Sequence, residues 1–222
     1  MIQLQDITKV YPIGKRELTV LKGITLNIEQ GELVAIMGAS GSGKTTLLNL
    51  IGCLDKPTSG SYYFEDKEVS GLSGSELARI RGQKVGFIFQ TFNLLSRLTA
   101  LANVELGMTY AGGVDRERAI EALAKVGLAD RVNHRPLELS GGEQQRVAIA
   151  RAIVKNPSLF LADEPTGQLD SHSGEEVISI LTSLHAEQGI TLLVVTHDAN
   201  IAHHCQRIIH LKDGEVVTEE SV

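Results

Sequence analysis

Residues 38–45 combine the glycines, the lysine and the hydroxyl groups that a phosphate site requires. They are Gly38, Ala39, Ser40, Gly41, Ser42, Gly43, Lys44 and Thr45, in the pattern G-x-x-x-x-G-K-[ST]. Glycines let the backbone wrap closely around an anion, so that successive N–H groups point at its oxygens. In this pattern the lysine reaches the β- and γ-phosphates of a nucleotide, and the threonine hydroxyl binds Mg²⁺. The loop therefore predicts a site for a nucleotide phosphate.

The segments on either side of this loop are the elements that such a site needs. The apolar run 32–37 predicts a buried strand, and 46–51, beginning with Thr46, predicts a helix. The positive end of the helix dipole would add to the attraction for phosphate. The alternative is a glycine-rich turn that happens to precede a lysine, and the flanking strand and helix argue against it.

Two carboxylates follow another apolar run. Asp163 and Glu164 end the segment 158–164, and two acids at the end of a buried strand are costly unless they meet cations or take part in catalysis. Asp163 would support Mg²⁺, and Glu164 would orient or deprotonate an attacking water. An acid pair at a helix start before Pro165 is the alternative, but it leaves the long apolar run unexplained.

The segment 139–146 reads LSGGEQQR and has two possible explanations. Ser140 and Glu143 are spaced as a capping box that opens a helix. Gly141 and Gly142 also give an anion access to the backbone at that helix start. A cap alone does not need two glycines followed by Gln-Gln-Arg. With the motifs above, the segment resembles the LSGGQ signature of the ABC-type ATPase family, with Glu143 where many members have glutamine.

The resemblance extends over nearly the whole chain and implies roles for residues whose local context is weak. Gln90 resembles the Q-loop glutamine, which binds Mg²⁺ and water, and His197 resembles the histidine that contacts the γ-phosphate. Tyr11 resembles the adenine-stacking aromatic residue, although a simple packing role is the alternative. Asp170 matches the D-loop, which in this family crosses to the partner subunit. Gln168 departs from the small residue or asparagine that is more usual there.

Short apolar runs alternate with amphipathic segments, which predicts an α/β fold with a P-loop NTPase core and a mainly parallel sheet. The expected strands are 24–28, 33–37, 60–64, 85–89, 159–162, 191–196, 208–211 and 215–217, the last two joined by a hairpin. The expected helices after position 92 are 101–110, 115–126 and 143–154. We expect a single ABC ATP-binding domain, 1–222, with an N-terminal antiparallel β part. Its core is 1–91 and 155–222, and its inserted α-helical subdomain is 92–154.

Composition bounds the remaining possibilities. The chain has 222 residues, is 42% hydrophobic and carries a formal net charge of −6, which argues against a nucleic-acid partner. No apolar run approaches a membrane span and the first residues are not a secretion signal, so we expect a cytoplasmic location. Cys53 and Cys205 predict neither a disulfide framework nor a metal site. A metal site involving the C-terminal histidines is unfavourable because adjacent His203 and His204 cannot easily face one ion.

The resemblance implies an ATPase that powers a membrane ABC transporter, with ATP and Mg²⁺ as cofactors. Ser140, Gly141, Gly142 and Glu143 would meet the ATP held by a second copy, in a head-to-tail pair. A separate transmembrane permease would hold the chain at the cytoplasmic face of the inner membrane. Residues 92–99 and 52–60 look most like the macrolide-exporter and lipoprotein-releasing branch. This suggests extrusion of lipoproteins, peptides or antibiotics.

Other classes of nucleotide-binding protein fit less well. A chromosome or DNA-repair ATPase of this family would split its motifs around a long coiled coil, and a translation-associated member would carry two cassettes. A GTPase would show an N-K-x-D motif, which the sequence lacks. A sensor that binds without hydrolysing would be expected to lose Glu164 or Lys44, and both are present.

Overall fold

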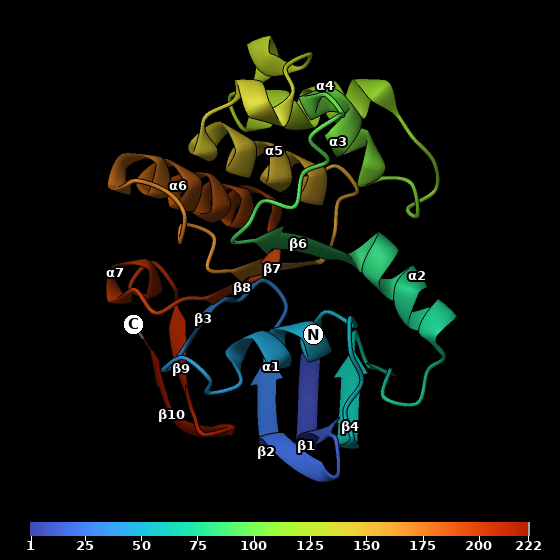
Figure 1. Ribbon diagram of the computed structural model, residues 1–222, viewed down its shortest axis with the longest axis vertical. Coiled ribbons are helices and arrows are strands. Elements are labelled where there is room, and N and C mark those ends of the chain that lie inside the picture. Colours follow the sequence, from blue (N-terminus) through green and yellow to red (C-terminus); the bar gives the residue numbers. More distant parts are fainter. Residues whose placement is uncertain (222) are drawn as a thin grey trace. The chain divides into compact units, whose positions relative to one another are not determined.

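The computed structural model describes residues 1–221, which fold as two compact units (Figure 1). The first unit contains Met1–Ala78 and the chain from Thr191 onward, and the second contains Arg79–Ile190. Helix α2 (Gly74–Lys84) spans the border between them in the sequence. The expected helical subdomain, 92–154, lies within the second unit, and its bounds stay a prediction.

The N-terminal strands of the first unit form the expected antiparallel sheet, which includes β1, β2 and β4 (Figure 1). Its strand order is β2-β1-β4-β5. Their bounds are Ile2–Ile13 for β1, Arg16–Ile28 for β2, Ser59–Phe64 for β4 and Lys67–Glu68 for β5. Strand β1 was not among the predicted strands. Its alternation is interrupted by a register shift between Leu4 and Ile7, where Asp6 adopts a positive φ of 51°.

The second set of strands in this unit is mainly parallel. Strands β9 (Arg207–Lys212), β3 (Leu33–Met37) and β8 (Thr191–Val195) run parallel, with β3 between the other two. Strand β10 (Glu215–Ser221) pairs antiparallel with β9, which confirms the predicted C-terminal hairpin. All of β8 is buried, as expected for a continuous apolar run in a parallel sheet.

Two helices in the first unit follow the parallel strands. Helix α1 (Lys44–Ile51) directly follows the glycine-rich loop and buries its leucines and Ile51. Helix α7 (Ala199–Ala202) follows β8. Within the register, Ile36 pairs with Val195, so the glycine-rich loop and His197 leave their strands at the same carboxyl edge.

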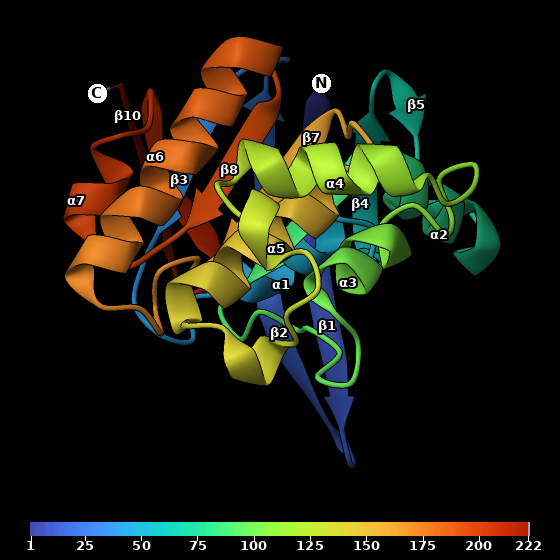
Figure 2. The same cartoon turned by 90° about the horizontal axis from the view of Figure 1, so that it is seen from above.

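The second unit contains one parallel strand pair and most of the helices. Strand β6 (Val85–Phe89) pairs with β7 (Leu159–Asp163), and the inserted helices lie between them in the sequence. These helices are α3 (Ala100–Leu106), α4 (Arg116–Lys125) and α5 (Gly141–Ile153), with two short 3₁₀ helices, Ala129–Arg131 and Pro136–Glu138. Figure 2 shows α3, α4 and α5 gathered together, and α5 also contacts β6 and α6 (Ser171–Gln188).

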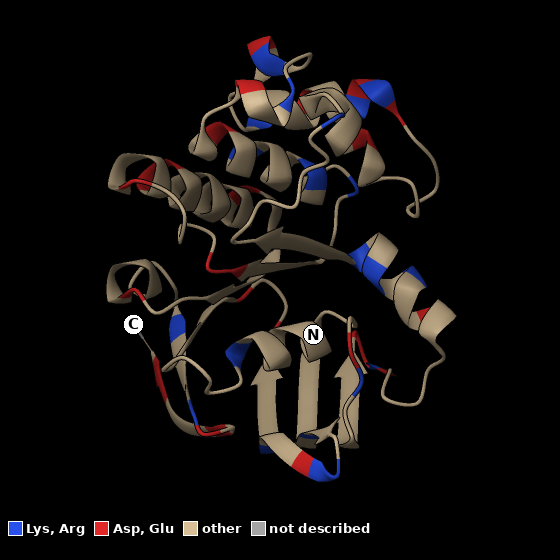
Figure 3. Ribbon diagram, viewed as in Figure 1, with Lys and Arg blue, Asp and Glu red and all other residues tan. Residues whose placement is uncertain are grey.

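The register of the second unit brings two predicted site segments together. Phe89 pairs with Asp163 at the ends of β6 and β7, so Gln90 and Glu164 leave the strands at the same edge. Acidic and basic residues are interspersed in the view of Figure 3, with Arg79, Arg81 and Lys84 on the second half of α2. No helix within residues 1–221 has the length and apolar character needed to cross a membrane.

Candidate nucleotide-binding site

The glycine-rich loop adopts a conformation that depends on its glycines. Gly43 has φ = +104°, a region that other residues rarely adopt. A Cβ on Gly38 would come within 2.1 Å of the carbonyl oxygen of Leu211, on the neighbouring strand. The loop therefore packs tightly against strand β9 at Gly38. A Cβ on Gly41 would meet nothing within 4 Å, so the loop is open at that position.

The N-terminus of α1 differs from those of the long helices in the second unit. Gly43 occupies its N-cap with no side-chain hydrogen bond, and its first turn has no acidic residue. By contrast, side chains cap α4, α5 and α6, from Asp115, Ser140 and Asp170. The first N–H groups of an α-helix need an acceptor, and α1 has no side chain that supplies one. This end of α1 is chemically suited to an anion.

Two side chains of the loop also fit a phosphate. The Lys44 ammonium donates to the carbonyl oxygens of Gly38 (2.8 Å) and Ala39 (3.0 Å), which holds the charge over the loop. The Ser42 hydroxyl is buried and has no hydrogen-bond partner within residues 1–221. A buried hydroxyl without a partner is costly, and a phosphate oxygen would satisfy it.

Tyr11 belongs to a polar cluster that fixes its ring. Its hydroxyl donates to Asp55 Oδ2 at 2.7 Å, and Lys9 Nζ donates to Asp55 Oδ1 at 2.6 Å. The Lys9 ammonium also lies 4.8 Å from the centre of the Tyr11 ring. Burial and the nearby Asp55 carboxylate raise the pKa of Tyr11. Burial alone would raise the pKa of Asp55, but hydrogen bonds from Lys9 and Tyr11 outweigh it and lower that pKa.

The carboxyl edge of β6 and β7 carries the predicted catalytic residues of the second unit. Asp163 ends β7, and Glu164 follows with φ = +47°, a conformation that is strained for a residue other than glycine. The Glu164 carbonyl accepts a hydrogen bond from the Gly167 N–H at 3.0 Å, which closes a tight turn. The side chain of Gln90 packs against Gly167. Strain confined to such a turn is a recurrent feature of functional sites.

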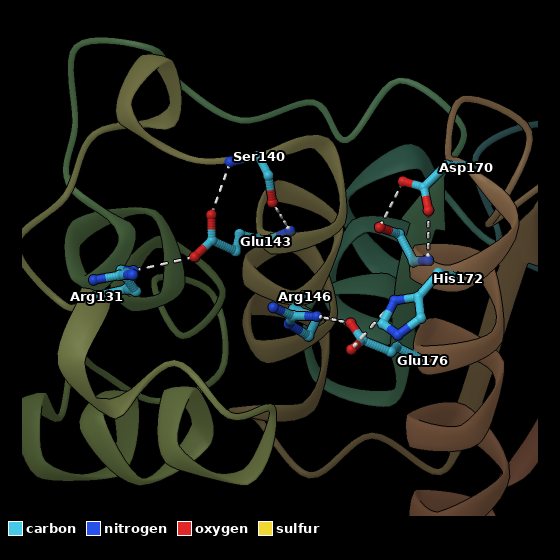
Figure 4. Close-up of polar contacts among 8 residues, drawn as sticks. Arg131, Ser140, Glu143, Arg146, Asp170, His172 and Glu176 are labelled. Carbon is cyan, nitrogen blue, oxygen red and sulfur yellow. Dashed lines mark hydrogen bonds and ion pairs between the residues drawn. The ribbon is translucent and has the colours of Figure 1, made fainter.

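The signature segment forms the start of α5, and Figure 4 shows its polar contacts. The Ser140 hydroxyl accepts from the Glu143 N–H at 3.2 Å, and the Glu143 carboxylate accepts from the Ser140 N–H at 2.8 Å, which confirms the predicted capping box. Arg131 donates to the same carboxylate at 3.1 Å. Hydrogen bonds from Ser140, then Arg131, lower the pKa of Glu143.

The predicted D-loop aspartate has a local structural role. Asp170 caps α6 by accepting from the Ser173 N–H at 3.0 Å and from its hydroxyl at 2.8 Å (Figure 4). One turn further along α6, Glu176 forms an ion pair with Arg146 of α5, and its carboxylate lies 3.7 Å from the His172 ring nitrogen Nδ1. The Arg146–Glu176 pair joins α5 to α6, whereas the other contacts lie within α6 and its N-cap. The proposed contact of Asp170 with a second copy stays a prediction.

The structure therefore places the predicted residues in two groups, one in each unit. The first unit brings the loop 38–46, Tyr11 and His197 to its site, and the second brings Gln90, Asp163, Glu164, Asp170 and the start of α5. Within residues 1–221, no group of three or more His, Cys, Asp and Glu side chains could hold a metal ion. His210 pairs with Glu220 at 2.7 Å, and Cys53 and Cys205 are buried thiols.

Sequence reasoning missed the residues that support the site. Lys9 and Asp55 hold Tyr11, and Arg131 holds Glu143. The only available signal was that Lys9 and Tyr11 are two residues apart on one strand and so share a face. Nothing in the local sequence connects Asp55 or Arg131 to its partner.

The fold and these loops define a P-loop nucleotide-binding protein. The profile of the ABC transporter family matches residues 21–167, more than half of the chain. The chain belongs to the ABC transporter family, as an ATP-hydrolysing cassette. The predicted family and fold class are therefore confirmed.

Several relatives are similar over the whole chain. It is 52% identical to the ABC transporter ATP-binding protein MJ0796 of Methanocaldococcus jannaschii, over 100% of this chain and 97% of that protein. It is 54% identical to the macrolide export ATP-binding/permease protein MacB of Rhodopirellula baltica, over 99% of this chain but 33% of that protein. The chain thus spans about a third of the length of MacB.

Solved structures agree with these relatives. The dimeric post-hydrolysis structure of the MJ0796 cassette bound to ADP and Pi superposes with a TM-score of 0.92 at 50% identity, covering 100% of this chain and 98% of that one. The cbiO1 protein of Clostridium perfringens, part of the cbiONQ transporter complex, gives a TM-score of 0.86 at 29% identity, covering 99% and 88%.

Proposed function

We propose that this chain binds MgATP at residues 38–45 and hydrolyses it to power a membrane transporter. The observation that carries the proposal is the start of α1, where helix N–H groups without a capping side chain, Lys44 and the buried Ser42 hydroxyl converge on one loop. Tyr11, held by Asp55, would stack on the adenine, and Thr46 would border the phosphates.

Three oxygen-bearing side chains suit Mg²⁺: the Thr45 hydroxyl, the Gln90 carboxamide and the Asp163 carboxylate. Mg²⁺ prefers such ligands and usually shares its coordination with substrate phosphates and water. When bound, Mg²⁺ neutralises phosphate charge during transfer. Glu164 would accept a proton from the attacking water, and His197 and Lys44 would contact the γ-phosphate.

The proposed assembly is a head-to-tail pair of two copies that closes on ATP. The start of α5, residues 140–143, would meet the ATP bound to the other copy, and Asp170 would lie at the contact between the copies. The dimeric structures of the similar MJ0796 cassette support this arrangement. Each copy carries a formal charge of −6, so long-range electrostatics oppose association. Short-range contacts to the shared nucleotides must therefore drive closure.

The proposed partner is a membrane permease, and the proposed location of the chain is the cytoplasmic face of the cell membrane. MacB, whose ATP-binding part resembles this chain, joins both parts in one protein. The similarity favours an exporter or an extrusion system for lipoproteins, peptides or antibiotics. We expect the permease to dock near residues 90–101. Cysteines at Ser96 or Arg97 that form no cross-link to an assembled permease would contradict that docking site.

Glu164→Gln tests the ATPase and dimer proposals together. The amide keeps the size of the carboxylate but cannot accept the proton, so hydrolysis should fall by roughly 10²–10⁴-fold. ATP binding should persist. The closed pair should accumulate, because the pair normally reopens only after hydrolysis. Size-exclusion chromatography with ATP and with ADP, beside a phosphate-release assay, measures both effects.

Glu175→Gln, at an exposed position on α6, is the matched control and should behave like the parent. A Glu164→Gln variant that stays monomeric with both nucleotides, while turning over at the parent rate, contradicts the base assignment and the paired mechanism.

A further inference from the structure

Helix α5 carries a buried glutamine, Gln145, near the end of the signature segment 139–146. Gln145 is 0% exposed, and its Nε2 donates to the carbonyl oxygens of Phe89 (3.3 Å) and Pro165 (2.6 Å). Phe89 immediately precedes Gln90, and Pro165 immediately follows Glu164. One carboxamide therefore binds the backbone next to Gln90 and next to Glu164, two residues of the proposed site.

The orientation of this carboxamide is set by chemistry. Only its NH₂ end can face two carbonyl oxygens, because its oxygen would repel both. With that orientation Gln145 Oε1 is buried and has no hydrogen-bond partner within residues 1–221. An unpartnered buried acceptor is destabilising. An apolar residue of this size would avoid that cost but would leave the Pro165 carbonyl oxygen without this donor, so what glutamine supplies at this position is its contact with the turn of Glu164.

Two segments held by α5 contain residues with an uncommon backbone conformation. Glu164 sits at φ = +47°, which persists only where its surroundings enforce it. Phe92 and Asn93, just after Gln90, also have positive φ values of 55° and 51°. Arg151, two turns further along α5, donates to both of their carbonyl oxygens. Helix α5 thus holds the chain on both sides of Gln90.

We propose that Gln145 is a positioning residue for hydrolysis, which fixes the turn that carries Glu164 and, more weakly, the strand end before Gln90. The shorter bond, to Pro165, makes Glu164 the main route of its effect. Gln145 does not touch the reacting atoms itself. Because it stands on α5, it also ties the turn of Glu164 to the helix whose first residues would meet the ATP of the second copy. This inference rests on the proposed function.

Gln145→Met is the decisive variant. Methionine has a similar volume, cannot donate, and removes the buried orphan acceptor, but it leaves the Pro165 carbonyl oxygen without this donor. The melting temperature is therefore measured beside kcat to check that the fold is retained. We expect kcat to fall by about 10–100-fold, since loss of precise orientation has effects of this size. The KM for ATP should stay within twofold, because residues 38–45 are untouched. Gln188→Met is the control, since Gln188 is an exposed glutamine at the end of α6, outside the proposed site.

A double variant separates this effect from a general loss of structure. In a Glu164→Gln background, single-turnover phosphate release should fall less than threefold further on adding Gln145→Met, because the residue through which Gln145 acts is already disabled. Full multiplication of the two losses overturns the proposal. So does a parent-like kcat in Gln145→Met, or a loss of kcat that only accompanies a lower melting temperature and weaker ATP binding.

Failure of the proposed function gives a different result. If Glu164→Gln alone keeps parent turnover, the base assignment is wrong whatever Gln145 does. If Glu164→Gln is inactive and Gln145→Met turns over like Gln188→Met, only the role of Gln145 is wrong.

Discussion

The Gln90 side chain lies directly against the backbone of Gly167. A Cβ at position 167 would come within 2.6 Å of Gln90 Nε2 and 3.2 Å of its Cδ. Both residues belong to the second unit, and Gly167 closes the turn that begins at Glu164. The absence of a side chain at 167 therefore decides where the Gln90 carboxamide can be.

Gly167→Ala should displace Gln90 without unfolding the protein. The clash is with the far end of a flexible side chain, so Gln90 moves and the backbone is kept. We expect kcat to fall by roughly 10-fold or more, because small displacements of site groups are costly, while the melting temperature changes by a few degrees. Gly174→Ala is the control, since its Cβ would meet Thr166 at an ordinary 3.5 Å. Equal kcat values for both variants would show that the position of Gln90 does not limit hydrolysis.

Lys44→Ala should nearly abolish ATP binding. The variant removes the ammonium that lies over the carbonyls of Gly38 and Ala39, and charge-assisted contacts to phosphate are strong. We expect ATP affinity, measured by calorimetry, to fall on the order of 100-fold. Lys15→Ala, an exposed lysine, controls for the change in net charge. Parent-like affinity in Lys44→Ala would refute the phosphate site.

Tyr11 variants should separate the ring from its hydroxyl. Stacking is worth about 0.5–1.5 kcal/mol, so Tyr11→Ala should raise the KM for ATP by about 2–10-fold with little change in kcat. Tyr11→Phe keeps the ring but loses the bond to Asp55, so a smaller rise is expected. Tyr63→Ala, a half-buried tyrosine on β4, is the control. If Tyr11→Ala leaves KM unchanged, the ring has only a packing role.

The sequence predicted the elements whose signal is local. Strands β3 and β6 have the expected bounds because each is a short, continuous apolar run. Helix α2 escaped prediction because only Leu77 is buried along its length. Helix α3 ends at Leu106, before the expected position 110, because Gly107 and the residues after it form turns. Helix α5 begins two residues earlier than expected, at Gly141, since Ser140 is its N-cap.

For the site as well, residues could be predicted only where the signal lies within a short stretch of sequence. Motifs 38–45 and 139–146 could be recognised because their chemistry is contained in eight consecutive residues each. The contacts of Gln145 could not, because its two acceptors lie 56 and 20 residues away in the sequence. Such side-chain contacts to distant carbonyls depend on tertiary packing, which spacing along the chain does not encode.

The last prediction concerns Glu143, which stands where the family more often has glutamine. Hydrogen bonds from Ser140 and Arg131 lower its pKa from the ordinary value of 4.5. A carboxyl group with a lowered folded-state pKa stabilises the fold above pH 4.5, and that contribution is lost as the pH falls through the folded-state pKa. Glu143→Gln should therefore cost about 0.3–1 kcal/mol at neutral pH, as expected for an anion at a helix N-terminus, and progressively less below pH 4.5.

Urea unfolding of the parent and of Glu143→Gln between pH 3 and 7 measures this difference, provided the slopes of the transitions agree. Glu121→Gln, an exposed glutamate on α4, controls for the loss of one negative charge. The amide oxygen of glutamine can still accept from Ser140, so the capping box keeps its geometry and the comparison isolates the charge. A difference between parent and Glu143→Gln that stays constant from pH 7 to pH 3 would mean that the ionised carboxylate adds nothing beyond its hydrogen bond.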